Sequence, residues 1–70
     1  GVSPRVRVNN RAIMNMIADI CEDKGEATLV DIYNMAISKK ITENEVDRVL
    51  AQMLKDGILY EHTTETYRFP

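Results

Sequence analysis

A strong helix-start signal precedes the last third of this chain and limits the folds open to it. The run Thr42-Glu43-Asn44-Glu45 has the spacing of a capping box, in which the Thr42 hydroxyl and the Glu45 carboxylate each accept a backbone N–H at the helix start. Ile41 and Val46 are spaced to form a hydrophobic staple around it. Apolar residues then recur at helical spacing, at Val46, Val49, Leu50, Met53 and Leu54. We therefore predict an amphipathic helix that begins after Thr42 and ends at Gly57.

Two strand-like segments follow this helix. Residues 58–61 and 66–69 are rich in β-branched and aromatic types and flank the polar turn Thr63-Thr64-Glu65, which predicts an antiparallel hairpin. Alternation along the first strand puts Ile58 and Tyr60 on one face and Leu59 on the other. An isolated hairpin is marginally stable in water, so we expect it to pack on the helices through its aromatic residues, Tyr60, Tyr67 and Phe69.

Two shorter helical segments precede the strongest one. We expect the first to begin near Asn9 or Asn10 and to end at Gly25. Its buried stripe is formed by Ile13, Met16, Ile17 and Ile20. We expect the second to be capped by Thr28 and to end near Ser38, with an apolar face formed by Leu29, Ile32, Tyr33, Ala36 and Ile37. A very short strand near Glu26-Ala27 could pair with the hairpin.

The order of these segments predicts an α+β winged helix-turn-helix, with three helices and a C-terminal two-stranded β-hairpin as the wing. Residues 10–70 form this domain. Residues 1–8 are interpreted as an extended, flexible linker or the remnant of a cleavage site, because Pro4 disfavours helix at the preceding residue. The chain begins at Gly1 rather than Met, so we expect a domain excised from a larger protein. The basic residues Arg5 and Arg7 are compatible with a solvated linker or with contact to a phosphate backbone.

The residue types that carry catalysis or bind metals are isolated in this chain. Cys21 is the single cysteine and His62 the single histidine, which excludes a disulfide framework and cysteine-based metal sites. The three glycines are isolated, so no loop can cradle a phosphate. We therefore expect no catalytic residue, no cofactor-binding residue and no metal ligand. No apolar run approaches the ~20 residues of a membrane span, and we expect no membrane partner.

The predicted third helix is the candidate nucleic-acid contact, but its charge opposes that role. Arg48, Gln52 and Lys55 recur on one outward ridge and could read bases or contact phosphates. The same helix carries Glu43, Glu45, Asp47 and Asp56, and the whole chain has a net charge of −2. Phosphate neutralisation supplies most non-specific affinity, so we expect duplex binding at about 10⁻⁴ M at physiological salt. The residues available for such a weak contact are Lys39, Lys40, Arg48, Gln52, Lys55 and Arg68.

A protein contact is the competing interpretation. Met35 lies away from the predicted core stripe of the second helix, and Leu59 lies opposite Ile58 and Tyr60 on the first strand of the hairpin. Exposed apolar residues of this kind can form part of a small interface. Met35 and Leu59 are therefore the candidate protein-contact residues, and we expect the isolated domain to be monomeric.

The C-terminal segment resembles a known family. The run Leu54-Lys55-Asp56-Gly57-Ile58-Leu59-Tyr60-Glu61, with the final Thr66-Tyr67-Arg68-Phe69, resembles the C-terminal end of archaeal minichromosome maintenance (MCM) replicative helicases. The likeness extends more loosely over residues 10–70. It implies a winged-helix appendage of a hexameric, ATP-driven DNA-unwinding motor whose catalytic machinery lies in a preceding AAA+ domain.

In that family the terminal domain is expected to modulate ATPase and unwinding activity or to contact loading proteins. The resemblance thus implies, as partners, the remainder of the parent helicase, replication-loading proteins and weakly bound DNA. It implies a cytoplasmic location in an archaeon, or a nuclear one in a eukaryote. Two alternatives stay open. The chain could be the DNA-binding domain of a winged-helix transcription regulator, or a pure protein-docking winged helix similar to that of the replication protein A middle subunit.

Overall fold

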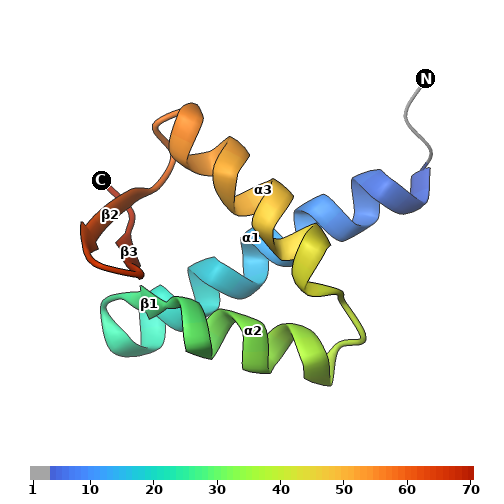
Figure 1. The fold of residues 1–70 in the computed structure, drawn as a ribbon, viewed down its shortest axis with the longest axis horizontal. Helices are drawn as coiled ribbons and strands as arrows, with labels where there is room; N and C mark the ends of the chain where they lie inside the picture. Colours follow the sequence, from blue (N-terminus) through green and yellow to red (C-terminus); the bar gives the residue numbers. More distant parts are fainter. Residues whose placement is uncertain (1–3) are drawn as a thin grey trace.

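The computed structural model describes the backbone of residues 4–70 and the side chains from Asn10 onward. Within this part of the chain, three helices lie beside a three-stranded antiparallel sheet at one end of the molecule (Figure 1). The elements are α1 (Pro4–Lys24), β1 (Ala27–Thr28), α2 (Leu29–Ser38), α3 (Glu43–Lys55), β2 (Tyr60–Thr63) and β3 (Thr66–Arg68). This is the α+β winged helix-turn-helix that the sequence predicts.

Helix α1 begins earlier than predicted. It starts at Pro4, so Asn9 and Asn10 lie inside the helix and do not cap it. The extended conformation predicted for residues 1–8 is therefore wrong from Pro4 onward, and residues 1–3 lie outside the described part. Proline is well tolerated in a first helical turn, because its fixed φ suits the helix and its missing N–H has no intrahelical acceptor there. The helix ends as predicted at Gly25, which has a φ of 82°.

The core lies between the three helices and the sheet. The stripes predicted for the first and third helices are confirmed, because their apolar residues are buried or packed against the core. Ile41 and Val46, the predicted staple pair, are also buried. Helix α2 contributes fewer residues to the core than predicted. Ile32 and Ala36 are buried, whereas Ile37 is 64% exposed. The assignment of Ile37 to the core is therefore wrong.

The sheet order is β1-β3-β2. Strand β1 pairs with β3 through Ala27 opposite Tyr67 and Thr28 opposite Thr66, so the very short strand predicted near Glu26-Ala27 exists one residue later. The N–H of Leu29 extends this pairing by donating to the carbonyl of Glu65 at 2.9 Å. The wing is thereby joined to the start of α2.

The inner and outer faces of the segment that leads into the wing are the reverse of the prediction. Leu59 is only 1% exposed, whereas Ile58 and Tyr60 are 38% and 43% exposed. The backbone N–H groups of Ile58 and Leu59 both donate to the carbonyl of Met53 at the end of α3, at 3.0 and 3.4 Å. The chain therefore folds back on the helix before β2 begins at Tyr60. Side chains alternate along residues 58–60 as predicted, but Leu59 rather than Ile58 and Tyr60 faces the core. Phe69 is also exposed, which leaves Tyr67 as the one buried aromatic anchor among the three predicted.

The capping box predicted at Thr42 is present. The Thr42 hydroxyl accepts the backbone N–H of Glu45 at 3.2 Å, and the Glu45 carboxylate accepts the backbone N–H of Thr42 at 3.1 Å. Replacing Thr42 by alanine removes one half of this pair and is expected to lower the free energy of unfolding by about 1 kcal/mol. Urea denaturation followed by circular dichroism would measure the loss. Thr42→Ser keeps the hydroxyl and should retain most of the stability; equal losses in the two variants would contradict this account.

Candidate nucleic-acid interface

The outer face of α3 is the candidate interface, and its exposure is as predicted. The three residues of the predicted outward ridge, Arg48, Gln52 and Lys55, are all exposed, and so are Asn44, Asp47 and Ala51. The helix and its C-cap residue carry four acidic residues, Glu43, Glu45, Asp47 and Asp56, against the two basic residues Arg48 and Lys55. The potential over this face is therefore unfavourable for a polyanion.

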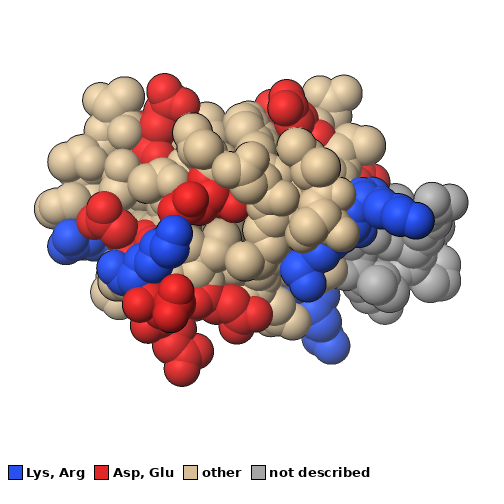
Figure 2. Space-filling view, turned by 90° about the horizontal axis from the view of Figure 1, so that it is seen from below, with Lys and Arg blue, Asp and Glu red and all other residues tan. Residues whose placement is uncertain are grey.

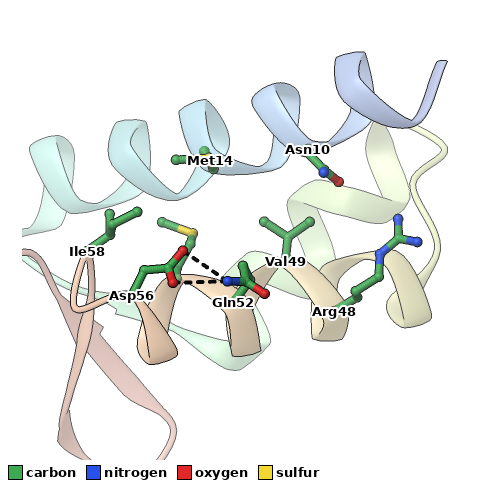
Figure 3. Close-up of a pocket in the computed structure, with 8 residues that line it drawn as sticks. Asn10, Met14, Arg48, Val49, Gln52, Asp56 and Ile58 are labelled. Carbon is green, nitrogen blue, oxygen red and sulfur yellow. Dashed lines mark hydrogen bonds between the residues drawn. The ribbon is translucent and has the colours of Figure 1, made fainter. Parts of the chain in front are cut away.

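Gln52 is held by a neighbouring carboxylate. Its Nε2 donates to both carboxylate oxygens of Asp56, each at 3.0 Å (Figure 3). The two residues are four positions apart on the helix, where side chains meet. A base edge that used the Gln52 amide would have to break this contact and approach a negative charge. Gln52 is thus a poorer candidate for base readout than its outward position predicts.

Arg48 stands at the rim of a groove between α1 and α3. The groove has a volume of about 220 Å³ and is lined on its apolar side by Met14, Val49, Met53 and Ile58 (Figure 3). Asn10 lines the same groove from α1, and its Oδ1 atom is buried without a hydrogen-bond partner among the described residues. The Arg48 guanidinium forms no ion pair within residues 10–70. It is therefore the basic side chain of α3 best placed to meet an anionic or polar ligand.

A contact between α2 and α3 uses one of the acids of the candidate interface. The Tyr33 hydroxyl on α2 donates to the carboxylate of Asp47 on α3. This hydrogen bond is the largest cause that raises the pKa of Tyr33 to about 12, because ionising the phenol would place two negative charges together. Asp47 thus faces α2 and stabilises the arrangement of the two helices of the helix-turn-helix. Sequence reasoning missed this pair because it depends on how α2 and α3 cross.

The Tyr33 pKa gives a direct test of this contact. In the folded chain Tyr33 keeps its proton up to about pH 12, whereas an unfolded tyrosine titrates near 10. Its stabilising contribution is therefore complete below about pH 10 and is lost as the pH rises towards about 12. Phenolate absorbance should show a late-titrating component that Tyr33→Phe removes and that Asp47→Asn moves towards the ordinary tyrosine range. If Tyr33 titrates near pH 10 in the unmodified chain, the contact does not persist in solution.

Arg68, the basic residue predicted on the wing, is paired with an acid. Its Nη2 and Nε donate to Glu26 Oε1 at 3.0 and 3.3 Å. The Glu26 carboxylate raises the pKa of Arg68 by accepting these bonds. Because Ala27 lies opposite Tyr67, the β1–β3 register brings Glu26 beside Arg68. The positive charge of β3 is therefore matched across the sheet, and the pairing could be predicted only once β1 was known to pair with β3.

The wing turn adds further negative charge. The Glu61 carboxylate accepts the backbone N–H of Glu65 at 2.8 Å, and Glu65 has a φ of 56°. Both glutamates are exposed, Glu65 in the turn of the hairpin and Glu61 on β2. A wing that approached DNA with this turn would carry two carboxylates towards the phosphates, which opposes binding.

The remaining basic candidates do not gather at one place. Lys39 and Lys40 are exposed in the turn that precedes α3, while Lys55 is the last residue of that helix. A helix of 13 residues separates the two sites by roughly 20 Å. Seen from the side of α2, most acidic side chains lie towards the end where α1 leads into β1, whereas basic side chains lie at both ends (Figure 2). Of the six predicted DNA-contact residues, only Arg48 and Gln52 line one groove.

The two predicted protein-contact residues lie in different environments. Met35 is half-buried, packs against the core and lines a second groove between α1 and α2. Leu59 is buried in the core, so the prediction that it is available to a partner is wrong. The prediction was wrong because it took Tyr60 as a residue that packs on the helices, which placed Leu59 on the outward face.

The described residues contain no cluster of three or more His, Cys, Asp or Glu side chains arranged to hold a metal ion. In the same part of the chain, no helix combines the length and the apolar character needed to cross a membrane. The Cys21 thiol donates towards the Tyr67 carbonyl at 3.8 Å, and burial raises its pKa. These features agree with a small structural residue at Cys21 rather than a reactive thiolate.

The comparison with protein-family models gives a match over almost the whole chain. The model of the MCM protein C-terminal winged helix-turn-helix domain matches residues 5–69. The match covers all three helices and the sheet described above except the first residue of α1. A search of the curated proteins and a search of the solved structures each return no match.

Proposed function

Because this chain belongs to the family of MCM protein C-terminal winged helix-turn-helix domains, we propose that it is an accessory domain of a replicative DNA helicase. In this proposal the domain performs no chemistry itself. It modulates ATP turnover and unwinding by contacting other protein surfaces, and it contacts DNA weakly at most. Its partners are the remainder of the parent MCM protein and proteins that load the helicase.

The charge of α3 is the observation that best supports a regulatory role over a DNA-reading one. The helix that enters the major groove in helix-turn-helix proteins here carries, together with its C-cap residue, twice as many acids as bases. Gln52 is bound to Asp56, and Arg68 is bound to Glu26. Of the basic residues predicted to contact DNA, Arg48 is the one that lines a groove. These contacts favour a domain that works mainly through proteins.

Deletion of the domain from its parent helicase tests this proposal. We expect the truncated enzyme to retain ATP hydrolysis and unwinding, because the fold is a small non-catalytic one, but at rates measurably different from those of the intact enzyme. Steady-state ATP turnover and forked-duplex unwinding should be measured on the same preparations. The proposal fails if deletion leaves both rates unchanged, and it fails equally if deletion abolishes ATP hydrolysis in a correctly assembled enzyme.

A further inference from the structure

The outward face of α2 carries apolar residues that the fold does not cover. Val30 and Ile37 are 65% and 64% exposed. They are seven residues apart, so they lie two turns apart on one side of the helix. Single exposed aliphatic residues are ordinary, but two on one side of a ten-residue helix form a ridge that a partner could cover. We refer to Val30 and Ile37 as the α2 ridge.

A groove runs along one flank of this ridge. It lies between α1 and α2 and has a volume of about 510 Å³. Ile20 and Met35 form its apolar side, and Asn34 connects it to the ridge. Methionine is flexible and adapts to the shape of an incoming side chain. The α2 ridge and the groove lie next to each other on one surface of the molecule, with the polar Asn34 and Ser38 between Ile37 and Met35.

Acidic side chains border this surface on both sides. Asp19 and Asp23 of α1 line the groove together with Asp31 of α2, which is paired with Lys24 at 3.1 Å. Among the described residues, Asp19 and Asp23 have no ion-pair partner. The surface seen from the side of α2 shows acidic side chains along two opposite edges, with mostly uncharged surface and some further charged side chains between them (Figure 2).

The second border belongs to α3. Tyr33 stands on the other side of the α2 ridge from the groove, as the helical spacing of α2 requires. It contacts Asp47, and Glu43 also raises its pKa through its charge. The apolar strip of α2 therefore lies between carboxylates of α1 and carboxylates of α3.

This arrangement of apolar and acidic side chains favours one kind of binding partner over the others. A second copy of the chain would bring the same acids against this face, which disfavours self-association. DNA and anionic lipid surfaces are repelled for the same reason. A helix with apolar residues along one side and Lys or Arg on its flanks matches both the apolar strip and the acidic borders. Lys39 and Lys40 lie beyond the C-terminal end of α2, so the acidic surface ends there.

We propose that the α2 ridge and the α1–α2 groove form the docking site for a basic amphipathic helix of a partner protein. The proposal rests on the regulatory function proposed above and identifies the surface and the chemistry of the partner. Val30 and Ile37 contact the apolar side of the helix. Asp19 and Asp23 pair with its basic flanks.

A pair of model peptides tests the chemistry of the site. Each peptide is a helix of about four turns with leucines along one side; the other positions are lysine in one peptide and glutamate in the second. Isotope-labelled chain would be titrated with each and followed by NMR. We expect saturable shifts from the lysine peptide centred on α2 and the C-terminal half of α1, with the glutamate peptide at least about tenfold weaker. Equal binding of the two peptides, shifts centred on α3 or the wing, or no saturable binding would each overturn the proposal.

A double variant at the groove and a matched control show whether the peptide binds at the proposed site or responds only to the net charge of the chain. Asp19→Asn with Asp23→Asn removes two charges at the groove, whereas Asp56→Asn with Glu65→Gln removes two charges away from it. We expect the first variant to weaken lysine-peptide binding at least about fivefold and the second to change it by less than about twofold. Equal weakening by the two would show that the peptide responds only to net charge, and the proposed site would be wrong.

The apolar ridge is tested separately, in the chain and in the parent helicase. Val30→Ser with Ile37→Ser alters only exposed residues, so the amide spectrum should stay that of the folded domain while peptide affinity falls. If deletion of the whole domain changes ATP turnover but this variant does not, the docking site is wrong and the regulatory function stands. If deletion itself is silent, the proposed function fails whatever the peptides show.

Discussion

Replacing Leu59 by alanine is expected to lower the free energy of unfolding by about 2–5 kcal/mol. The side chain is 1% exposed and belongs to the core cluster between the helices and the sheet. Truncation would leave a cavity that the backbone around it cannot close, because the N–H groups of Ile58 and Leu59 are both bound to the carbonyl of Met53. A small domain has a total stability of only about 5–15 kcal/mol. The variant should therefore be close to unfolding at moderate temperature.

The neighbouring residue provides the matched control. Ile58 is 38% exposed, and Ile58→Ala should cost less than about 1 kcal/mol, because much of the deleted surface is already in water. Urea denaturation of both variants under the same conditions would give the two losses. A larger loss for Ile58 than for Leu59 would mean that Ile58, and not Leu59, faces the core.

The features that sequence reasoning predicted correctly depend on local signals. The capping box at Thr42, the cap at Thr28 and the positive φ of Gly25 each involve residues within a single turn. The outward positions of α3 follow from helical periodicity alone, so the exposed candidates of the interface could be assigned before the fold was known. The winged-helix class followed from the order of these segments.

The features that could not be predicted depend on tertiary contacts. Whether Ile37 is buried or exposed depends on how α1 and α3 cover α2. They cover only the side that carries Ile32 and Ala36. Arg68 meets Glu26 across 42 residues of sequence. Neither the exposure of Ile37 nor the pairing of Arg68 with Glu26 can be predicted from the local spacing of residues. The pairing of Arg68 changes the candidate interface, because it removes a basic residue on which the sequence prediction relied.

The second large effect is expected from neutralising the acids of α3. The substitutions Glu43→Gln, Asp47→Asn and Asp56→Asn leave Arg48 and Lys55 against the single acid Glu45 on this helix. The net charge of the chain rises from −2 to +1, and Gln52 no longer faces a carboxylate. We expect duplex affinity at about 50 mM salt to rise roughly ten- to hundredfold, and the gain to shrink at about 200 mM. Fluorescence anisotropy with a labelled duplex would measure both values.

A control with the same net charge shows whether position matters. Glu22→Gln, Asp23→Asn and Glu65→Gln also remove three negative charges, but from α1 and the wing turn. If the acids of α3 are what keeps this helix from DNA, the α3 variant should bind clearly more tightly than the control, with NMR shifts centred on Arg48 and Lys55. Equal gains in duplex affinity in the two variants would mean that only the net charge of the chain matters, and not the position of the acids. No gain in either would mean that this winged helix lacks the shape for a groove whatever its charge, and that weak DNA contact should be dropped from its proposed function.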